Sequence, residues 1–333
     1  MNRPIKSKVF IDSSCDILYA SFYIQGLFSL FGKRNVKFSS KYFSDFKHDN
    51  HFFAFVIINS IGIKKIVIDF TDSSKIALKP LDWCHVYGKI NYNQEINNSN
   101  KIMPIGPSFG IRVFNLQETF VFAISNYIKS FNRIPNVRRF FADYKRMYTR
   151  PKLSNFESSE SISKTNYIFF ISSLWKNEPL TNGFRANFIK SCKSISNISF
   201  EGGFAPRTKN DIPGFETLTT LSRVSMDEYI ANTKKSSFVF NTPAVKSCHG
   251  WKLAEFMCLG KAIISTPLSR EMPEKFVDKK HVLFTDGTQT DLNEKIEFLF
   301  NNLVLRSSLE TEAKKYFASY LSPVSVIRTL NKF

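Results

Sequence analysis

The stretch from Lys246 to Glu255 combines residue types that bind a phosphorylated ligand. Lys246, His249 and Lys252 are basic, and Gly250 leaves the backbone uncovered where a helix is expected to begin. Cationic side chains and the amides of a helix N-terminus bind phosphate oxygens. Glu255, farther along the same helix, can accept two hydrogen bonds from a vicinal diol such as that of a ribose. The spacing predicts a site in which a diphosphate binds at the basic loop and a ribose binds farther along the helix, at Glu255.

These residues lie where a helix is expected to follow a strand. Ser237–Asn241 is a short apolar run typical of a strand, and Trp251–Leu259 is a predicted helix that ends at Gly260. Ala262–Ser265 is predicted as the next strand. Ligands of open α/β sheets bind beyond the carboxyl ends of the strands. The order of the elements therefore places the basic loop at the edge of the sheet where a ligand is expected.

Apolar runs and helical segments alternate along the 333 residues, a length that favours two domains. Several runs are continuously apolar, which is typical of strands buried on both faces of a parallel sheet. The other expected strands are 8–11, 36–39, 52–58, 65–70, 86–90, 102–105, 167–172 and 198–201; the other expected helices are 17–31, 116–130, 181–191, 222–233, 291–303 and 307–320. This pattern predicts an α/β protein with doubly wound domains at 1–150 and 167–333, a polar linker at 151–166, and a last helix able to pack back on the first domain.

The segment from Cys248 to Leu268 resembles the donor-binding helix and strand of GT-B-fold glycosyltransferases, close to bacterial enzymes of the family-one or exostosin-like type. The resemblance implies two Rossmann-like domains facing across a cleft and a nucleotide-diphosphate sugar as donor substrate, with no separate cofactor. It also implies a glycan or lipid-linked acceptor in cell-surface polysaccharide synthesis. The donor-binding residues that it implies are Lys176, Arg185, Lys246, His249, Gly250, Trp251, Lys252 and Glu255.

One departure from the family pattern leaves the stereochemical course of the reaction open. Many retaining members carry a second glutamate eight positions before the helix glutamate, where this sequence has Ser247. An inverting enzyme would instead need a general base from the N-terminal domain, within reach of the acceptor hydroxyl. Asp69 and Asp72 follow an expected strand and are the first choice for this catalytic role. Asp12 and Asp16, after the first strand, are the next choice.

The sequence predicts no metal site. It contains no Asp-x-Asp motif, and its five histidines are not paired at the spacing of metal ligands. The charge of a leaving diphosphate would then be neutralised by backbone amides, His249 and cations such as Lys176 or Lys246.

The net charge of +18 suggests an anionic partner. Lys129–Lys152 carries eight lysines and arginines against one acid, with aromatic residues between them. Such a segment suits an anionic membrane surface, and a solvated helix with inward-facing aromatics explains it equally well. A basic nucleic-acid-binding protein is a further alternative, although no RNA-binding signature occurs and no specific nucleic acid is expected. A catalytically silent homologue that binds a sugar nucleotide also stays open.

No segment has the run of about 20 apolar residues that a spanning helix requires. The N-terminus lacks the features of a secretory signal, and the five cysteines are widely spaced without a Cys-x-x-Cys motif. We therefore expect a cytoplasmic protein with reduced thiols, peripheral to the inner membrane face if the basic segment binds lipid.

Overall fold

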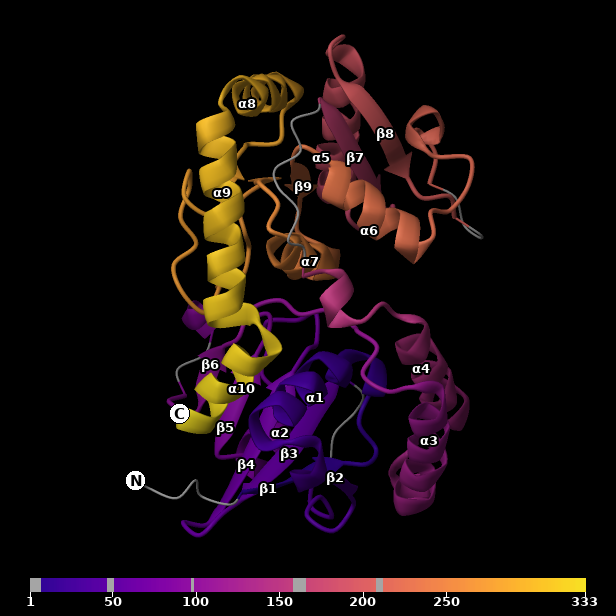
Figure 1. Ribbon diagram of the computed structural model, residues 1–333, viewed down its shortest axis with the longest axis vertical. Helices are drawn as coiled ribbons and strands as arrows, with labels where there is room; N and C mark the ends of the chain where they lie inside the picture. The colour runs from indigo at the N-terminus through magenta and orange to yellow at the C-terminus, as the bar shows by residue number, and fades with distance from the viewer. Residues whose placement is uncertain (1–6, 47–50, 97–98, 158–165, 208–211) are drawn as a thin grey trace. The chain divides into compact units, whose positions relative to one another are not determined.

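The computed structural model describes residues 7–46, 51–96, 99–157, 166–207 and 212–333. The chain forms two compact units, each with its own hydrophobic core. The first unit contains Met1–Leu153, Glu271–Pro273 and Ser319–Phe333, and the second contains Ser154–Arg270 and Glu274–Ala318. Both units combine strands and helices, which confirms the expected α/β class (Figure 1). Of the expected linker, residues 158–165 lie outside the described part of the chain.

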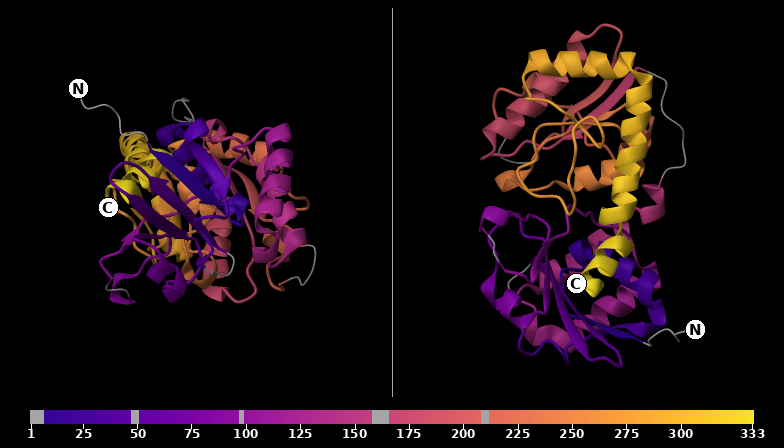
Figure 2. Two further views of the ribbon diagram at one scale, coloured as in Figure 1. Left: turned by 90° about the horizontal axis from the view of Figure 1, so that it is seen from below. Right: turned by 90° about the vertical axis from the view of Figure 1, so that its left-hand side faces the viewer.

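The first unit is built on a six-stranded sheet in the order β2-β1-β3-β4-β5-β6. The central strand at 52–58 is entirely apolar and almost entirely buried, and the next strand is buried over residues 66–69, so both faces of the sheet must be covered there. The sheet has the twist usual for such structures, visible in Figure 2. The strands are β1 (Lys8–Asp12), β2 (Val36–Ser39), β3 (Phe52–Ile58), β4 (Ile63–Asp69), β5 (Val86–Lys89) and β6 (Ile102–Pro104).

The expectation of an all-parallel sheet is wrong for one strand. Strand β3 runs antiparallel to both β1 and β4, while the other pairs in this sheet are parallel. The reason is the short connection after Ile58, which turns at Asn59–Gly62 with a hydrogen bond from the amide of Asn59 to the carbonyl of Gly62. A parallel neighbour would need a crossover of a dozen or more residues.

Helices cover the sheet of the first unit. Helix α1 (Ile17–Phe31) is buried along most of its length and packs against the last helix, α10 (Pro323–Lys332). Helices α3 (Leu116–Ser130) and α4 (Val137–Thr149) form a pair beside them, and α2 (Leu78–Trp83) is a short helix before β5. A capping box stabilises the start of α3. The Asn115 side chain accepts a hydrogen bond from the amide of Glu118, and the Glu118 side chain accepts one from the amide of Asn115.

The second unit has five parallel strands in two small sheets, ordered β11-β10-β9 and β7-β8. A backbone hydrogen bond of 2.8 Å from Ser237 to Tyr167 joins the β7 strand to the segment that leads into β9. The strands are β7 (Tyr167–Ser172), β8 (Ser199–Phe204), β9 (Val239–Asn241), β10 (Ile263–Ser265) and β11 (Leu283–Phe284). The helices are α5 (Pro179–Ser194), α6 (Met226–Lys235), α7 (Trp251–Leu259), α8 (Gln289–Asn301) and α9 (Leu303–Tyr316).

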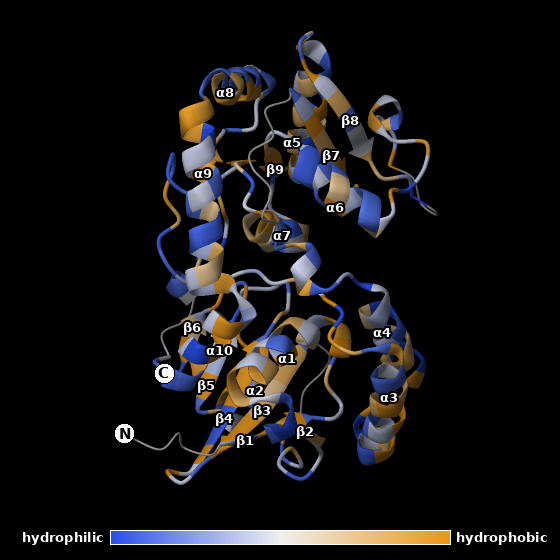
Figure 3. Ribbon diagram, viewed as in Figure 1, coloured by the Kyte–Doolittle hydropathy of each residue, from blue (hydrophilic) through white to orange (hydrophobic). Residues whose placement is uncertain are grey.

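Local sequence signals account for most of these boundaries. Helix α6 starts at Met226 rather than at the expected residue 222, because Ser225 and Glu228 form a capping box there. Helix α7 ends at Gly260, whose φ of 66° lies in the left-handed region that favours glycine. Hydrophobic residues concentrate on the strands and on the inner faces of most helices (Figure 3). None of the helices in the described part of the chain has the length and apolar character needed to cross a membrane.

Candidate functional site

A hollow lies at the carboxyl end of β9, within the second unit. Its lining comes from the loop after β9, from the start of α7 and from the loop after β10, and includes His249 and Gly250. The strands β9 and β10 are parallel, so their carboxyl ends meet at this edge. This is the edge of the sheet at which the sequence predicted a ligand.

The loop between β9 and α7 has a strained backbone. Lys246 and Ser247 both adopt positive φ angles, of 55° and 58°, although neither is a glycine. Residues with side chains occupy this region at a cost, and such residues cluster at functional sites. Surrounding contacts hold the conformation: the Lys246 amide donates to Glu178 Oε1 at 2.7 Å, and its carbonyl accepts from Arg270 at 2.9 Å. Both side chains of the strained pair are exposed.

Gly250 occupies the N-cap position of α7, and the structure describes no side chain that caps this end. A Cβ atom built on Gly250 would meet only the Cβ of Ala244, at 3.7 Å, which is an ordinary contact. The φ of Gly250 is −80°, which any residue can adopt. The protein itself therefore does not require glycine here, whereas a ligand approaching the backbone amides of the helix N-terminus would.

Lys252, the second residue of α7, lies against aromatic rings. Its Nζ donates to the carbonyl of Ile171 and lies 5.7 Å from the ring centre of Phe170 and 5.3 Å from that of Tyr229. The side chain is partly exposed as a whole, but these rings remove water from the ammonium group. The pKa of Lys252 is lowered to about 7, mainly by burial and also by the nearby guanidinium of Arg185, while the charge of Glu255 opposes this shift. An anion beside this ammonium would favour its charged form.

Glu255 is buried one turn beyond Lys252, with 4% of its surface exposed. Its Oε2 accepts a hydrogen bond of 2.8 Å from the hydroxyl of Tyr229 in α6. One oxygen of the carboxylate that the sequence predicted to bind a ribose is therefore already engaged inside the unit. Lys252 and Glu255 are three residues apart on one helix face, so their charges attract each other.

Arg185, also expected to bind the donor, is buried in α5 and joins two loops. It donates to Thr242 Oγ1 at 2.9 Å, to the carbonyl of Ser173 at 2.8 Å and to that of Pro243 at 3.3 Å. Burial lowers its pKa to about 10. Three of its nitrogen atoms thus hold the loops after β7 and β9 together. The Arg185 side chain contributes to the site by fixing the positions of these two loops.

The remaining predicted residues differ in their placement. Lys176 is exposed on the loop between β7 and α5. His249 is 8% exposed and lines the hollow, and Trp251 is half-buried at the first position of α7. The structure thus gathers His249 and Gly250 at the hollow itself. Lys252 and Glu255 follow on the same helix.

Tyr229 and Phe170 are site residues that sequence reasoning missed. Tyr229 is 26 positions from Glu255, and Phe170 lies on β7, with no spacing relation to α7. Their contacts with the Lys252–Glu255 pair arise from packing of separate elements. Neither residue belongs to a local pattern that would have revealed it.

Of the two expected catalytic carboxylates, Asp69 is fully buried in the first unit. It accepts hydrogen bonds from Tyr87 at 2.5 Å, from Lys89 at 2.8 Å and from Thr71 at 2.7 Å. Its ion pair with Lys89 is buried as well, with 1% and 0% of the two side chains exposed. An acceptor hydroxyl would have no access to this carboxylate, so the geometry gives no support to a general base at Asp69.

Asp72 is exposed, and it belongs to a group of ionisable residues after β1 and β4 of the first unit. Burial is the main cause that raises the pKa of Tyr19, and the charges of Asp16 and Asp72 add to it, so both carboxylates lie in the neighbourhood of this hydroxyl. The Asp16 carboxylate accepts from the backbone amide of His51 at 3.1 Å and lies 3.8 Å from its Nδ1. His51 has a φ of 82° and a side chain that is 43% exposed. An exposed imidazole beside a partly buried carboxylate is a suitable proton acceptor.

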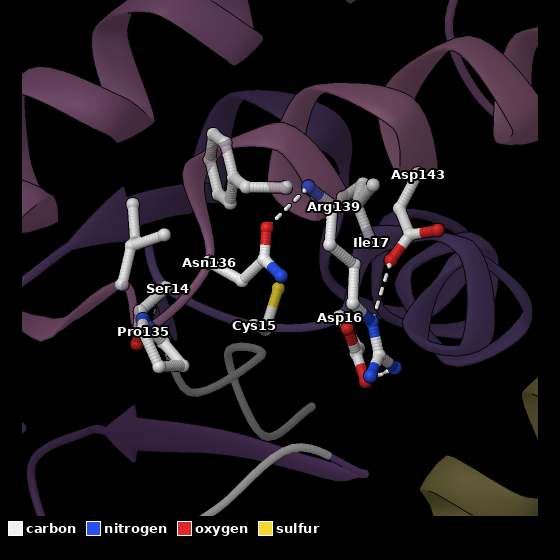
Figure 4. A pocket seen from close by; sticks show the side chains of 10 residues that line it. Ser14, Cys15, Asp16, Ile17, Pro135, Asn136, Arg139 and Asp143 are labelled. Carbon is white, nitrogen blue, oxygen red and sulfur yellow. Dashed lines mark hydrogen bonds and ion pairs between the residues drawn. The ribbon is translucent and has the colours of Figure 1, made fainter.

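Asp16 also lines a separate pocket of the first unit, shown in Figure 4. There Arg139 binds Asp16 at 3.2 Å and Asp143 at 3.5 Å, so one guanidinium links α4 to the start of α1. Burial raises the pKa of Asp143, and the Asp16 charge adds to this effect. Asp12, the other second-choice carboxylate, is buried and bound through two bonds by Arg133, at 3.0 Å and 2.9 Å. It therefore has a structural partner.

Comparisons with known families and curated proteins return no match for this sequence. The fold is similar to solved structures. One is the C-terminal domain of a glycosyl transferase group 1 family protein, LpcC, from Francisella tularensis, with 14% identity, a TM-score of 0.38, and coverage of 50% of this chain and 96% of that domain.

A second similar structure is TarM from S. aureus in a complex that includes UDP, with 11% identity, a TM-score of 0.45, and coverage of 79% of this chain and 48% of TarM. A third is a putative UDP-N-acetylglucosamine 2-epimerase from Listeria monocytogenes, with 10% identity, a TM-score of 0.43, and coverage of 96% and 93%. The chain thus spans about half the length of TarM and most of the epimerase.

Proposed function

We propose that this protein is a nucleotide-sugar-dependent glycosyltransferase of the GT-B type whose donor site lies at the start of α7. The observation that carries the proposal is the start of α7, where Gly250 provides no side-chain cap and where no contact among the described residues requires a glycine. The backbone amides at the start of α7 suit a diphosphate, and we assign His249, Lys246 and Lys176 as the basic groups of the site. Glu255, one and a half turns along the helix, is assigned to the ribose of the donor.

Direct binding tests this assignment. Isothermal titration with UDP, UDP-glucose and UDP-N-acetylglucosamine should give saturable binding to the purified chain, and a thermal-shift panel of other nucleotide sugars should identify the preferred base and sugar. UDP is a suitable first probe because the TarM structure contains it. Absence of binding by every nucleotide sugar would overturn the proposal. Conversion of the sugar to its epimer without transfer would show a different reaction at the same kind of site.

The acceptor side of the reaction is assigned to the first unit. Asp72 keeps its place as a candidate base because it is exposed, and His51 beside Asp16 joins it. Asp72→Asn and His51→Ala should each be compared with wild type for transfer and for UDP-sugar binding. The catalytic base is the residue whose loss lowers the rate of transfer while donor affinity stays unchanged. If neither change alters transfer, the base lies elsewhere or the reaction retains configuration.

The acceptor that we propose is a glycan or a lipid-linked saccharide of cell-surface polysaccharide synthesis, used on the cytoplasmic side of the membrane. Transfer is proposed to proceed without a metal cofactor, with cations and amides neutralising the leaving diphosphate. The competing proposal is a silent homologue that only binds the sugar nucleotide, because Ser247 stands where a glutamate is common in retaining enzymes. Product formation with any acceptor distinguishes the two.

A further inference from the structure

Helix α3 presents its apolar residues to solvent and its polar residues to the interior. Its buried positions are the small or polar residues Thr119, Ala123, Asn126 and Ser130. Most of its large apolar residues are instead exposed, as is Phe131 just after its end, whereas Phe122 is half-buried against Phe38 and Phe114. The exposed fractions are Leu116 65%, Phe120 68%, Val121 55%, Ile124 41%, Ile128 66% and Phe131 64%. A helix in contact with water alone normally has the reverse arrangement.

Hydrogen bonds fix this orientation of the helix. Asn126 Nδ2 donates to the hydroxyl of Tyr144 at 2.8 Å, and the hydroxyls of Ser130 and Ser13 are 2.6 Å apart. Both contacts are buried, and they tie α3 to α4 and to the segment after β1. Rotating α3 to bury its apolar face would leave these polar groups without partners, at a considerable cost. The outward apolar face is therefore built into the fold.

The exposed residues form one continuous face. Leu116, Phe120, Ile124 and Ile128 recur every fourth residue, and at about 3.6 residues per turn they follow a single ridge of the helix. The ring of Tyr127 lies 5.3 Å from that of Phe141, which extends the face onto α4. Orange segments along α3 in Figure 3 show the apolar residues of this helix.

Two cations border this face on α4. Arg138 and Lys145 are exposed, and they share the solvent side of the helix with Phe141, which is 38% exposed. Within the described residues, neither cation has an ion pair or a hydrogen bond from its side chain. Glu118, the acidic residue within α3, forms an ion pair with Lys33.

Several other cations of 129–152 have internal partners and contribute less to any surface charge. The pairs are Arg133 with Asp12, Arg139 with Asp16 and Asp143, and Arg146 with Asp143, while Lys129 and Arg150 donate to backbone carbonyls. Fewer cations of this segment therefore remain available to bind an anionic surface. The exposed apolar face has to supply most of the attraction.

We propose that α3 is a membrane-docking element whose apolar face enters the head-group region of an anionic bilayer while Arg138 and Lys145 bind lipid phosphates. An apolar helix face with cations at its border suits this environment. A second copy of the chain fits less well, because a two-fold contact would bring the same cations together without acids to pair with them. A nucleic acid also fits less well, because its charged phosphates would lie against the apolar face of α3.

The test uses the full chain and vesicles of phosphatidylcholine with phosphatidylglycerol. Wild-type protein should float with these vesicles and bind less to pure phosphatidylcholine. Changing Phe120, Ile124 and Ile128 together to serine should reduce binding by about tenfold or more, since each loses apolar area that would be buried. The matched control changes Leu180, Leu221 and Val304 to serine, because these are also exposed apolar residues, 69%, 104% and 83%, in the second unit. That control should bind as wild type.

A probe on α3 measures insertion directly. The five native cysteines are buried, so Ile124→Cys provides one accessible thiol for an environment-sensitive dye. Its emission should shift to the blue with anionic vesicles, whereas a dye on Val304→Cys should not respond. Arg138→Gln with Lys145→Gln should weaken binding and reduce its dependence on salt.

Failure of wild-type protein to bind anionic vesicles, or unchanged binding by the triple serine variant, would overturn the proposal. A dimer in sedimentation velocity that the same variant separates would also overturn it, in favour of a second copy. Tight binding of an oligonucleotide that the charge variant abolishes, without lipid binding, would do so in favour of nucleic acid. Titration with UDP-glucose in the absence of vesicles tests the donor site independently, so the failure of one proposal can be distinguished from the failure of the other.

Discussion

The hydroxyl of Tyr229 in α6 donates a hydrogen bond of 2.8 Å to Oε2 of Glu255 in α7. This bond satisfies one oxygen of a buried carboxylate and fixes its orientation. Lys252 lies over the Tyr229 ring and attracts the same carboxylate. The three side chains therefore interact with one another. A test of the donor-binding role proposed for Glu255 has to include a variant of Tyr229.

We expect Glu255→Gln to weaken UDP-sugar binding by about 1.5–3 kcal/mol, roughly 10- to 150-fold, because hydrogen bonds to a charged acceptor are lost. Glutamine keeps the volume of the side chain and an oxygen for Tyr229, so the melting temperature should change little. Tyr229→Phe serves as the comparison, since it removes the internal hydrogen bond and leaves the charge. Its effect on donor affinity should be smaller. Equal affinities of wild type and the Glu255 variant would refute the ribose assignment.

Gly250→Ala should block the approach of a diphosphate to α7 without unfolding the protein. The added Cβ has an ordinary contact of 3.7 Å with Ala244, so the fold should accept it. Gly183→Ala is the matched control, because a Cβ on Gly183 meets no atom within 4 Å in the middle of α5. The control should gain about 0.5–1 kcal/mol of stability from helix propensity and bind donor normally. Normal donor binding by Gly250→Ala would argue against a phosphate at this amide.

Donor affinity should depend on pH through Lys252. The pKa of Lys252 is lowered to about 7 in the ligand-free protein, mainly by burial. A bound diphosphate favours the charged ammonium and raises that pKa, so binding above pH 7 takes up a proton. Affinity for UDP-glucose should therefore fall as pH rises above about 7, by up to about tenfold per pH unit. Titrations in buffers of different ionisation enthalpy measure the proton uptake, and Lys252→Met should abolish it. A flat profile for wild type would place the diphosphate away from this ammonium.

Transfer should continue after removal of divalent metal. The sequence has no Asp-x-Asp motif, and the site instead offers basic residues and helix amides to the diphosphate. Rates measured with and without a chelator should agree within error, with a metal-dependent transferase as the positive control for chelation. Loss of activity that magnesium or manganese restores would show that the reaction needs the ion.

Gly26→Ala should destabilise the first unit. A Cβ on Gly26 in α1 would overlap the carbonyl of Pro323 in α10 and approach Ile327 Cγ1 to 2.9 Å. Overpacking of this kind costs about 1–3 kcal/mol, so urea unfolding should show a clear loss of stability. Gly62→Ala is not a suitable control, because its φ of 153° adds strain of its own. Gly183→Ala provides the comparison again, and equal stability of the two variants would mean that α10 can move away from α1.

The sequence by itself determined the elements whose signals are local. The apolar periodicity of 17–31 and 116–130 predicted α1 and α3 with the bounds that the structure has, and Gly260 marked the end of α7. The candidate loop after β9 was also recognisable, because its basic residues and Gly250 stand together between a strand and a helix. Such signals depend on neighbours within a few residues, which the linear order preserves.

Only the tertiary structure decided which partners these elements meet. In the folded chain Asp69 forms an ion pair with Lys89, and Arg185 donates a hydrogen bond to a backbone carbonyl. The carboxylate of Glu255 accepts a hydrogen bond from Tyr229, and β3 pairs with its neighbours in the antiparallel direction. The tertiary structure also turned the apolar ridge of α3 outward, although the same periodicity would suit a buried helix. Hydrogen bonds from residues such as Asn126 to distant elements select one orientation among those that the pattern allows, and no spacing within the helix encodes that choice.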